Sequence, residues 1–406
     1  MTRGCPDHTT RSCTFDRPGH AHTTALVAIF GLANSLGACN STEDACTLWN
    51  TSSFVFDQPS NADAVLLCMG RRKTNAQDYF GRTPLFWAAH RTTNAAVVEA
   101  LLELGADPAI VDNRGRTPLH AAAGNPELGV TVALLRSGIL DVNVRSDLGR
   151  VPLYYAANNP NPAVADALLN AGSEPNAADL DGSTPLHNVL SSVTGTLLID
   201  AGADPSAKTL AGKTPLMRAT ARSDGLELAK VLVSGGAEVN AQTEWGLSAL
   251  HFAVRHKATA ELVAMLLRTG ADPNQRAWLG MTPLHVAVLG DDHEIVVSLL
   301  QSGADETARD DWGHTPLHTA SIWSQRETII DLLLATEIDV NLQDRLGETP
   351  LHLAAYWNPD PMIIAKLLHA GADLRAKNVQ GETPSDKVRR RAVAAPDNVV
   401  ELLRVS

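Results

Sequence analysis

Four histidines at almost regular intervals are the first candidates for chemistry in this chain. His251, His285, His318 and His352 follow one another at steps of 34, 33 and 34 residues. Imidazole is a common zinc ligand, so the pattern raises the question of a metal site. The answer depends on whether the fold can bring two rings within the roughly 4.5 Å that separates ligands of one zinc ion.

Other motifs that carry chemistry fail at a specific residue or do not occur. Residues 211–214, Ala-Gly-Lys-Thr, resemble the end of a phosphate-binding loop, but that motif needs glycine where the chain has Ala207. The sequence contains no G-x-S-x-G, no H-E-x-x-H and no paired cysteine motif. A formal net charge of −12 disfavours nucleic acid and anionic membranes as partners. We therefore expect no catalytic residue, no cofactor and no metal.

A repeated unit explains the spacing of the histidines. In most units a glycine is followed, one residue later, by Thr-Pro-Leu, and a Leu-Leu-x-x-Gly segment comes afterwards. The glycines recur at steps of 30 to 34 residues: Gly81, Gly115, Gly149, Gly182, Gly212, Gly246, Gly280, Gly313, Gly347 and Gly381. Asp and Gly predict a turn, Thr-Pro predicts a capped helix start, and the later glycine predicts a left-handed helix end. Each unit is therefore a turn plus two helices, and the fixed period predicts a stacked array.

The G-x-T-P-L-H and L-L-x-x-G-A-D motifs resemble those of ankyrin repeats. The resemblance covers residues 78–403 and implies an all-α solenoid of about ten repeats with β-hairpin fingers along one edge. Residues 39–77 would hold a degenerate N-terminal capping repeat, and Ser385 and Asp386 in the last unit would help to cap the other end. The units are expected near 78–111, 112–145, 146–178, 179–208, 209–242, 243–276, 277–309, 310–343, 344–377 and 378–403.

The same resemblance gives the recurring histidines a structural role. In ankyrin repeats this histidine forms hydrogen bonds that hold the unit together. Successive helix layers pack about 8–10 Å apart, which is too far for neighbouring rings to share one zinc ion. The metal interpretation is therefore set aside.

Departures from the repeat predict where the array is irregular. Val151 replaces the capping threonine of the third unit, and Glu337 replaces the helix-ending glycine of the eighth. The fourth unit takes only 30 residues from Gly182 to the next glycine. It should therefore have a trimmed helix pair, a local bend near residues 187–200 and the weakest internal joint.

The N-terminal region differs from the repeats because it holds all five cysteines. Residues 24–38 carry no charge and have the length of the hydrophobic part of a secretory signal. Leu36 to Cys39 is similar to the lipobox of bacterial lipoproteins, which implies a lipid on Cys39. Residues 1–38 would then be a signal peptide, or alternatively a disordered leader.

Export would place the protein in an oxidising compartment, where Cys46 and Cys68 are the plausible disulfide pair. We expect an exported protein, either periplasmic or a membrane-anchored lipoprotein. A cytoplasmic protein with an uncleaved tail is the alternative.

Tryptophans are the main candidates for a binding surface, because aromatic residues make up only 4% of the chain. Trp245 and Trp312 immediately precede a repeat glycine, at a finger tip, and Trp278 lies one residue earlier and could point to the other side. Trp323 and Trp357 lie ten residues after the glycine, at the end of the first helix on the concave side. Binding hot spots are enriched in tryptophan. Alternatively, each ring covers a neighbouring finger as structural filler.

Tyr79 and Phe80 at the first finger form a separate candidate site. Together these residues predict a monomeric scaffold that binds a protein partner along its concave face and finger tips. The alternatives are a membrane-anchored structural spacer and an accessory domain of an enzyme complex.

Overall fold

The computed structural model describes residues 74–138, 140–324, 327–358, 360–390 and 397–404. The expectations for the leader 1–38, for most of the cap 39–77 and for the three cysteines Cys39, Cys46 and Cys68 fall outside these ranges. None of the helices in the described ranges combines the length and apolar character needed to cross a bilayer.

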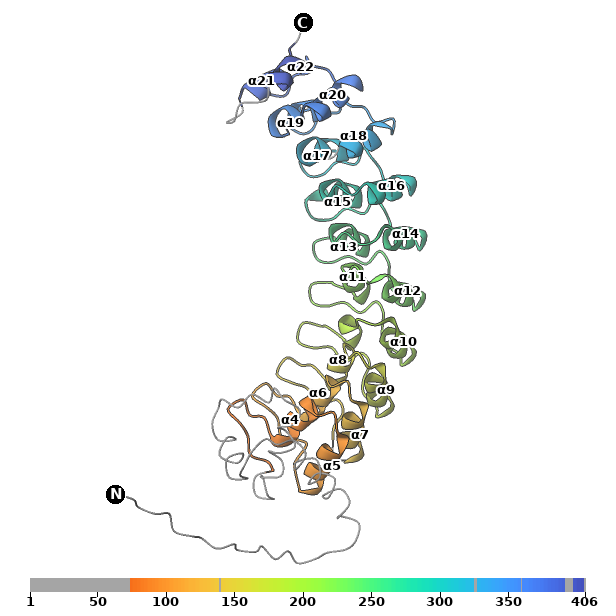
Figure 1. The fold of residues 1–406 in the computed structure, drawn as a ribbon. Helices are drawn as coiled ribbons and strands as arrows, with labels where there is room; N and C mark the ends of the chain where they lie inside the picture. Colours follow the sequence, from red (N-terminus) through yellow and green to blue (C-terminus); the bar gives the residue numbers. More distant parts are fainter. Residues whose placement is uncertain (1–73, 139, 325–326, 359, 391–396, 405–406) are drawn as a thin grey trace, which may run out of the picture.

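Each repeat glycine begins one unit with two antiparallel helices (Figure 1). The first helices are α4 (Pro84–Arg91), α6 (Pro118–Ala123), α8 (Pro152–Ala156), η1 (Pro185–Asn188), α11 (Pro215–Thr220), α13 (Ala249–Arg255), α15 (Pro283–Gly290), α17 (Pro316–Trp323), α19 (Pro350–Trp357) and α21 (Pro384–Arg389). The second helices are α5 (Ala95–Glu103), α7 (Leu128–Arg136), α9 (Pro162–Asn170), α10 (Ser192–Asp200), α12 (Leu226–Ser234), α14 (Ala260–Arg268), α16 (His293–Gln301), α18 (Glu327–Leu334), α20 (Pro361–His369) and α22 (Asp397–Leu402). A further short turn, η2 (Trp278–Gly280), lies in the seventh finger.

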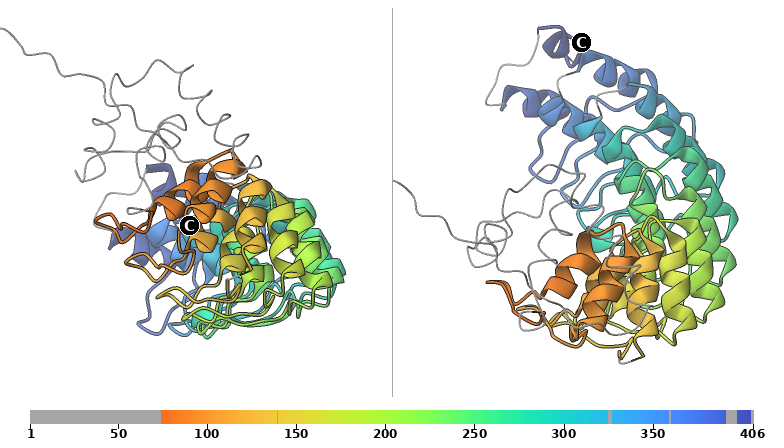
Figure 2. Two further views of the ribbon diagram at one scale, coloured as in Figure 1. Left: turned by 90° about the horizontal axis from the view of Figure 1, so that it is seen from below. Right: turned by 60° about the horizontal axis from the view of Figure 1, so that its bottom comes forward.

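The units stack into a curved array with two layers of helices. The stack bends into an arc, and the fingers and first helices line its inner side while the second helices form the outer side (Figures 1 and 2). The core runs along the array between the layers, where Leu119 of α6 and Leu134 of α7 are fully buried. Ten finger glycines and an all-helical stack confirm the predicted solenoid.

The recurring histidines each connect their own unit to the next one. His318 Nδ1 accepts a hydrogen bond from the backbone N–H of Thr315 at 3.2 Å. Its Nε2 lies 3.1 Å from the carbonyl oxygen of Glu348 in the following unit. The same bridge occurs at six positions: His120, His187, His251, His285, His318 and His352. Both ring nitrogens are thus used, and in the described ranges no group of three or more metal-binding side chains forms.

The fingers are hydrogen-bonded turns rather than two-stranded hairpins. In the second finger, Asp112 N donates to the carbonyl of Arg116 at 2.9 Å and Gly115 N donates to that of Asp112 at 3.0 Å. No β-strand forms in the described part of the chain, because each arm offers too few residues for a ladder before the next helix begins. Fingers are joined to one another instead, as where Asn113 N donates to the Phe80 carbonyl at 2.9 Å.

Two departures from the repeat have visible consequences in the described units. Val151 is the N-cap residue of α8 and provides no side-chain cap, as expected for a residue with no hydroxyl. In the last unit Asp386 replaces the histidine, and its carboxylate accepts from the backbone N–H of Thr383 at 3.0 Å. The terminal unit therefore keeps its cap but has no histidine to bridge to a following layer.

The fourth unit is trimmed, but only in its first helix. The helix η1 is a single turn of 4 residues, whereas α10 has the usual 9. The predicted shortening of both helices is thus wrong for the second one, because α10 must still span the outer layer between α9 and α12. The local bend near residues 187–200 stays a prediction.

Candidate interaction surface

The five candidate tryptophans all lie on the surface of units six to nine. Their exposed fractions lie between 50% and 63%. A ring used only as filler would be covered on both faces. At these exposed fractions, a large apolar area of each tryptophan ring is open to solvent. The five residues are Trp245, Trp278, Trp312, Trp323 and Trp357.

Three of these rings gather at the finger tips. Trp245 and Trp278 meet edge to face, with ring centroids 6.1 Å apart. Of the two orientations left open by its sequence position, Trp278 thus takes the one on the same side as Trp245. The reason is local. The backbone N–H of Trp278 donates to the backbone carbonyl of Trp245 at 2.7 Å, and Leu279 adopts a left-handed conformation with φ of 61°. Trp312 stacks on His314 of its own finger at 6.1 Å.

The other two rings form a second row at the far end of the first helices. Trp323 and Trp357 are the last residues of α17 and α19, and Tyr356 lies edge to face with Trp357 at 4.8 Å. Each helix has 8 residues, and such a helix is about 12 Å long. The tryptophans thus lie in two rows, one at the fingers and one at the helix ends, rather than in one continuous band.

Tyr79 and Phe80 project from the first finger, far along the chain from the tryptophans. Tyr79 is 80% exposed and Phe80 is 52% exposed. Their rings meet edge to face at 5.3 Å, and the guanidinium of Arg82 lies 4.8 Å from the Phe80 ring. This end of the array therefore combines aromatic rings with positive charge.

A row of residues at the base of the fingers changes its charge along the array. It consists of the residue that follows each repeat glycine. In six of the ten members the backbone carbonyl is the one to which the histidine of the preceding unit bridges. We call it the finger-base row. In chain order it reads Arg82, Arg116, Arg150, Ser183, Lys213, Leu247, Met281, His314, Glu348 and Glu382. The row is basic in the early units, apolar in the middle and acidic at the end.

Most charged members of the finger-base row have a partner. Arg116 pairs with Asp112 at 2.7 Å, and Arg150 pairs with Asp179 at 3.0 Å. His314 lies between two buried carboxylates, at 3.6 Å from Asp310 and 3.2 Å from Asp344. At the last units Glu348 pairs with Lys387, and Glu382 pairs with Arg390.

Two carboxyl groups of these pairs, those of Asp344 and Asp112, have a lowered pKa. Burial alone would raise the pKa of Asp344, but hydrogen bonds from the His314 side chain and from the backbone of Glu348 and Leu346 outweigh it and lower the pKa. The pKa of Asp112 is lowered in the same way, against burial, by hydrogen bonds from Arg116. The two glutamates at the acidic end of the row are neutralised by ion pairs with Lys387 and Arg390. At the basic end, Arg82 has no ion pair in the described part of the chain.

The finger-base row was not predicted from the sequence, although the change in charge along it is present there. Each member stands directly after a repeat glycine, so the row can be read off once the units are aligned. It was missed because aligning units emphasises what they share, and this position is the one at which they differ.

Stacked helix–turn–helix units with fingers on one edge define a solenoid repeat protein. A family described as "Ankyrin repeats (3 copies)" matches residues 58–146, 153–243, 190–277, 216–310 and 284–378. The chain belongs to the ankyrin-repeat family. Proteins of this kind generally mediate protein–protein interactions, and their fold is typically a non-enzymatic scaffold.

Part of the chain is also similar to solved structures. The ankyrin repeat domain of Bcl-3, titled a unique member of the IkappaB protein family, shares 29% sequence identity with the chain at a TM-score of 0.47. The similarity covers 54% of this chain and 99% of that domain. No curated protein matches the chain.

Proposed function

We propose that the chain is an interaction scaffold that holds a protein partner along the concave face and finger tips of units six to nine. The observation that carries the proposal is the set of five tryptophans, each at least half exposed, in two rows of consecutive units. Exposed aromatic rings that cluster on one part of a protein surface commonly mark interaction sites. A structural spacer would need no such rows, and an accessory role in an enzyme complex would still require a protein contact.

The tryptophan rows are tested by replacing Trp245, Trp312 and Trp323 with alanine one at a time. A partner is first isolated with the full chain as bait from the native compartment. Each hot-spot replacement is expected to weaken binding by about 30-fold or more, because truncating such a residue costs about 2 kcal/mol. Affinity is measured by titration calorimetry, and the melting temperature shows whether the fold is intact.

The matched control is Leu180→Ala, at the tip of the fourth finger. Leu180 is 68% exposed but lies outside both tryptophan rows. Its replacement is expected to leave affinity unchanged. If all three tryptophan variants bind like the unaltered chain while remaining folded, the partner binds elsewhere.

We further propose that the protein is exported and that its mature form begins near residue 39. The uncharged run at residues 24–38 and the confinement of all five cysteines to the N-terminal region support this. In protein from its own host, intact mass and N-terminal sequencing are expected to show cleavage near Cys39 and a Cys46–Cys68 disulfide, with a lipid on Cys39 if the lipobox is used. Detection of residues 1–30 in the mature form would contradict export by this route.

A further inference from the structure

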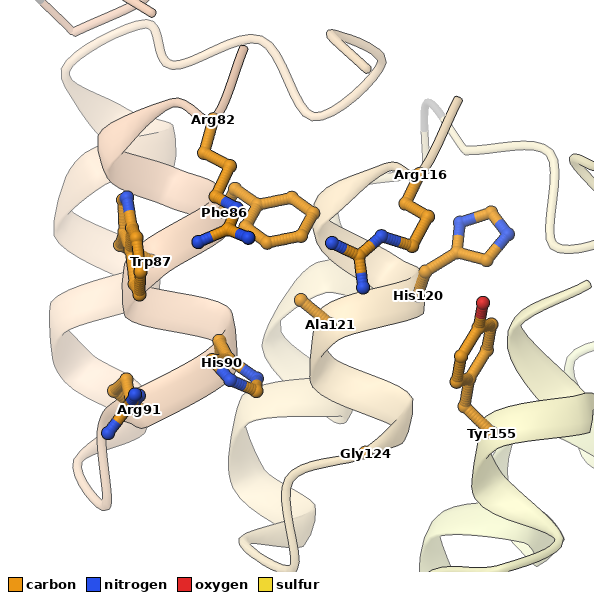
Figure 3. A pocket seen from close by; sticks show the side chains of 10 residues that line it. All are labelled: Arg82, Phe86, Trp87, His90, Arg91, Arg116, His120, Ala121, Gly124 and Tyr155. Atoms are coloured by element: carbon orange, nitrogen blue, oxygen red, sulfur yellow. The ribbon is translucent and has the colours of Figure 1, made fainter. Parts of the chain in front are cut away.

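A hollow on the inner side of the first three units is the strongest feature that the tryptophan rows do not include. It has a volume of about 300 Å³ and lies between α4, α6 and α8 (Figure 3). Its lining contains three arginines, two histidines and three aromatic residues, with no acidic residue. In a chain with a net charge of −12, this is a local concentration of positive charge beside apolar walls.

Arg82 differs from Arg116 in the hydrogen bonds of its side chain. Its guanidinium lies 4.7 Å from the Trp87 ring and 5.9 Å from the Phe86 ring. Its Nε is buried and has no hydrogen-bond acceptor in the described part of the chain. Arg116 also lies over Phe86, but its Nε and one terminal nitrogen donate to Asp112 at 3.0 and 2.7 Å. Arg82 is therefore held in place by rings and left with a free donor.

The charges around the hollow act differently on His90 and on Arg82. Partial burial, together with the charges of Arg91, Arg82 and Arg116, lowers the pKa of His90. Burial also lowers the pKa of the Arg82 guanidinium, against the attraction of Asp78. An anion that enters the hollow would relieve both effects.

The shape of the hollow favours a carboxylate over a phosphate. Phosphate sites commonly use free backbone amides at a helix start, but here the Phe86 N–H already donates to Thr83 Oγ1 at 3.2 Å. The planar guanidinium of Arg82 matches the two oxygens of a carboxylate. The apolar walls from Phe86, Ala121 and Tyr155 suit the methylene groups of a glutamate side chain.

We propose that this hollow binds carboxylate side chains of an acidic segment of the protein partner, with Arg82 as the main contact. The inference rests on the proposed function, in which the concave face binds a protein partner. It adds the chemistry of one part of that partner. It places that acidic part at units one to three, apart from the tryptophan rows of units six to nine.

The test uses the full chain and two short dye-labelled peptides that differ only in having glutamate or glutamine. By fluorescence anisotropy, the glutamate peptide is expected to bind at least about tenfold more tightly, because charged hydrogen bonds are stronger than neutral ones. Its affinity is expected to fall as salt is raised. Equal binding of the two peptides would overturn the proposal, as would full displacement of the glutamate peptide by inorganic phosphate at matched concentration.

Variants of the full chain locate the contact. Arg82→Gln is expected to weaken binding of the glutamate peptide about tenfold, and Arg82→Lys is expected to weaken it less. The matched control is Arg136→Gln, because Arg136 is an exposed arginine at the end of α7 in the outer layer. Unchanged binding in a folded Arg82→Gln variant would overturn the assignment. Should that variant fail to fold, the two-peptide comparison on the unaltered chain decides the question.

The two proposals fail separately. Trp323→Ala is expected to leave binding of the glutamate peptide unchanged, because Trp323 lies five units beyond the last helix of the hollow. If partner binding depends on the tryptophans while both peptides bind alike, only the acidic subsite is wrong. If the glutamate peptide binds through Arg82 while the tryptophan variants keep full partner affinity, only the tryptophan rows are wrong.

Discussion

Lowering the pH from about 6.5 to about 4 is expected to destabilise the repeat array strongly, because its bridging histidines are buried in their neutral form. Burial lowers the pKa of His120, His251 and His318 from 6.5 to about 4. Hydrogen bonds to the carbonyls of the next unit oppose this shift without cancelling it. Burial lowers the pKa of the other three bridging histidines in the same direction: His187, His285 and His352.

The direction of the effect follows from proton uptake. Between pH 6.5 and 4 the unfolded chain binds more protons than the folded array, so the free energy of unfolding falls as the pH falls. Above pH 6.5 the stabilisation is fully present. For one histidine with a folded pKa of about 4, the loss amounts to about 3 kcal/mol. Several such groups acting together would exceed the stability of an ordinary domain.

The geometry explains why a proton is not tolerated. In each bridge Nδ1 accepts from a backbone N–H, as from Thr117 to His120 at 3.0 Å. Protonation at Nδ1 removes that acceptor and places two donors face to face. Protonation destabilises every unit that carries the bridge. The array is therefore expected to lose stability along most of its length rather than at one end.

The measurement is chemical unfolding followed by circular dichroism between pH 7.5 and pH 4. His251→Met is the informative variant, because the fifth unit already has Met217 at this position, with Sδ 3.5 Å from the backbone N of Thr214. It is expected to flatten the pH profile. His369→Met, which changes an exposed histidine at the end of α20, is the control and keeps the profile of the unaltered chain. A stability that is the same at pH 4.5 and pH 7 would refute the argument.

The sequence predicts the elements that every unit must build. The Thr-Pro start, the left-handed glycine and the bridging histidine recur in most units because each layer solves the same capping and packing problem, so the repeated copies identify the pattern. The orientation of a side chain that occurs in only one unit is harder to predict. Trp278 turned toward Trp245 because of a backbone bond between adjacent fingers, which depends on the stacking of two units and not on either sequence alone.

The candidate site is predicted less completely than the fold for the same reason. Exposure of Trp245 or Trp323 could be inferred from its place outside the repeated core positions. The hollow could not, because it needs Arg82, Ala121 and Tyr155 from three different units and depends on which arginine is already paired. Arg116 is paired with Asp112 across one finger, whereas Arg82 Nε has no hydrogen-bond acceptor in the described part of the chain. Only the side-chain contacts reveal that difference.

The fourth unit is expected to open before the rest of the array. At the third position of the second helix, other units bury an aliphatic side chain, such as Val164 in α9 and Leu262 in α14. The fourth unit has Thr194 there, and its hydroxyl is buried without a hydrogen-bond partner in the described part of the chain. Gly195 follows in the middle of α10. A buried unsatisfied hydroxyl and a mid-helix glycine each cost about 1 kcal/mol or more.

Hydrogen exchange is expected to show faster opening over residues 182–212 than over residues 280–347, by roughly 30-fold for a difference of about 2 kcal/mol. The single turn of η1 adds to this difference, because its 4 residues give the inner layer little to pack. Since repeats contact only their neighbours, a weak unit can open while both flanking halves stay folded. Uniform protection along the array would contradict the expectation.

One substitution should strengthen the weak unit and identify its cause. Thr194→Val keeps the side-chain shape, removes the unsatisfied hydroxyl and is expected to slow exchange over residues 182–212 by about 5- to 10-fold, equivalent to about 1 kcal/mol. Thr131→Val is the matched control, because the buried Thr131 hydroxyl donates to the carbonyl of Ala122 at 3.2 Å. That variant is expected to speed exchange in the second unit instead. If both variants shift exchange in the same direction, the buried hydroxyl is not what weakens the fourth unit, and the short first helix must carry the effect alone.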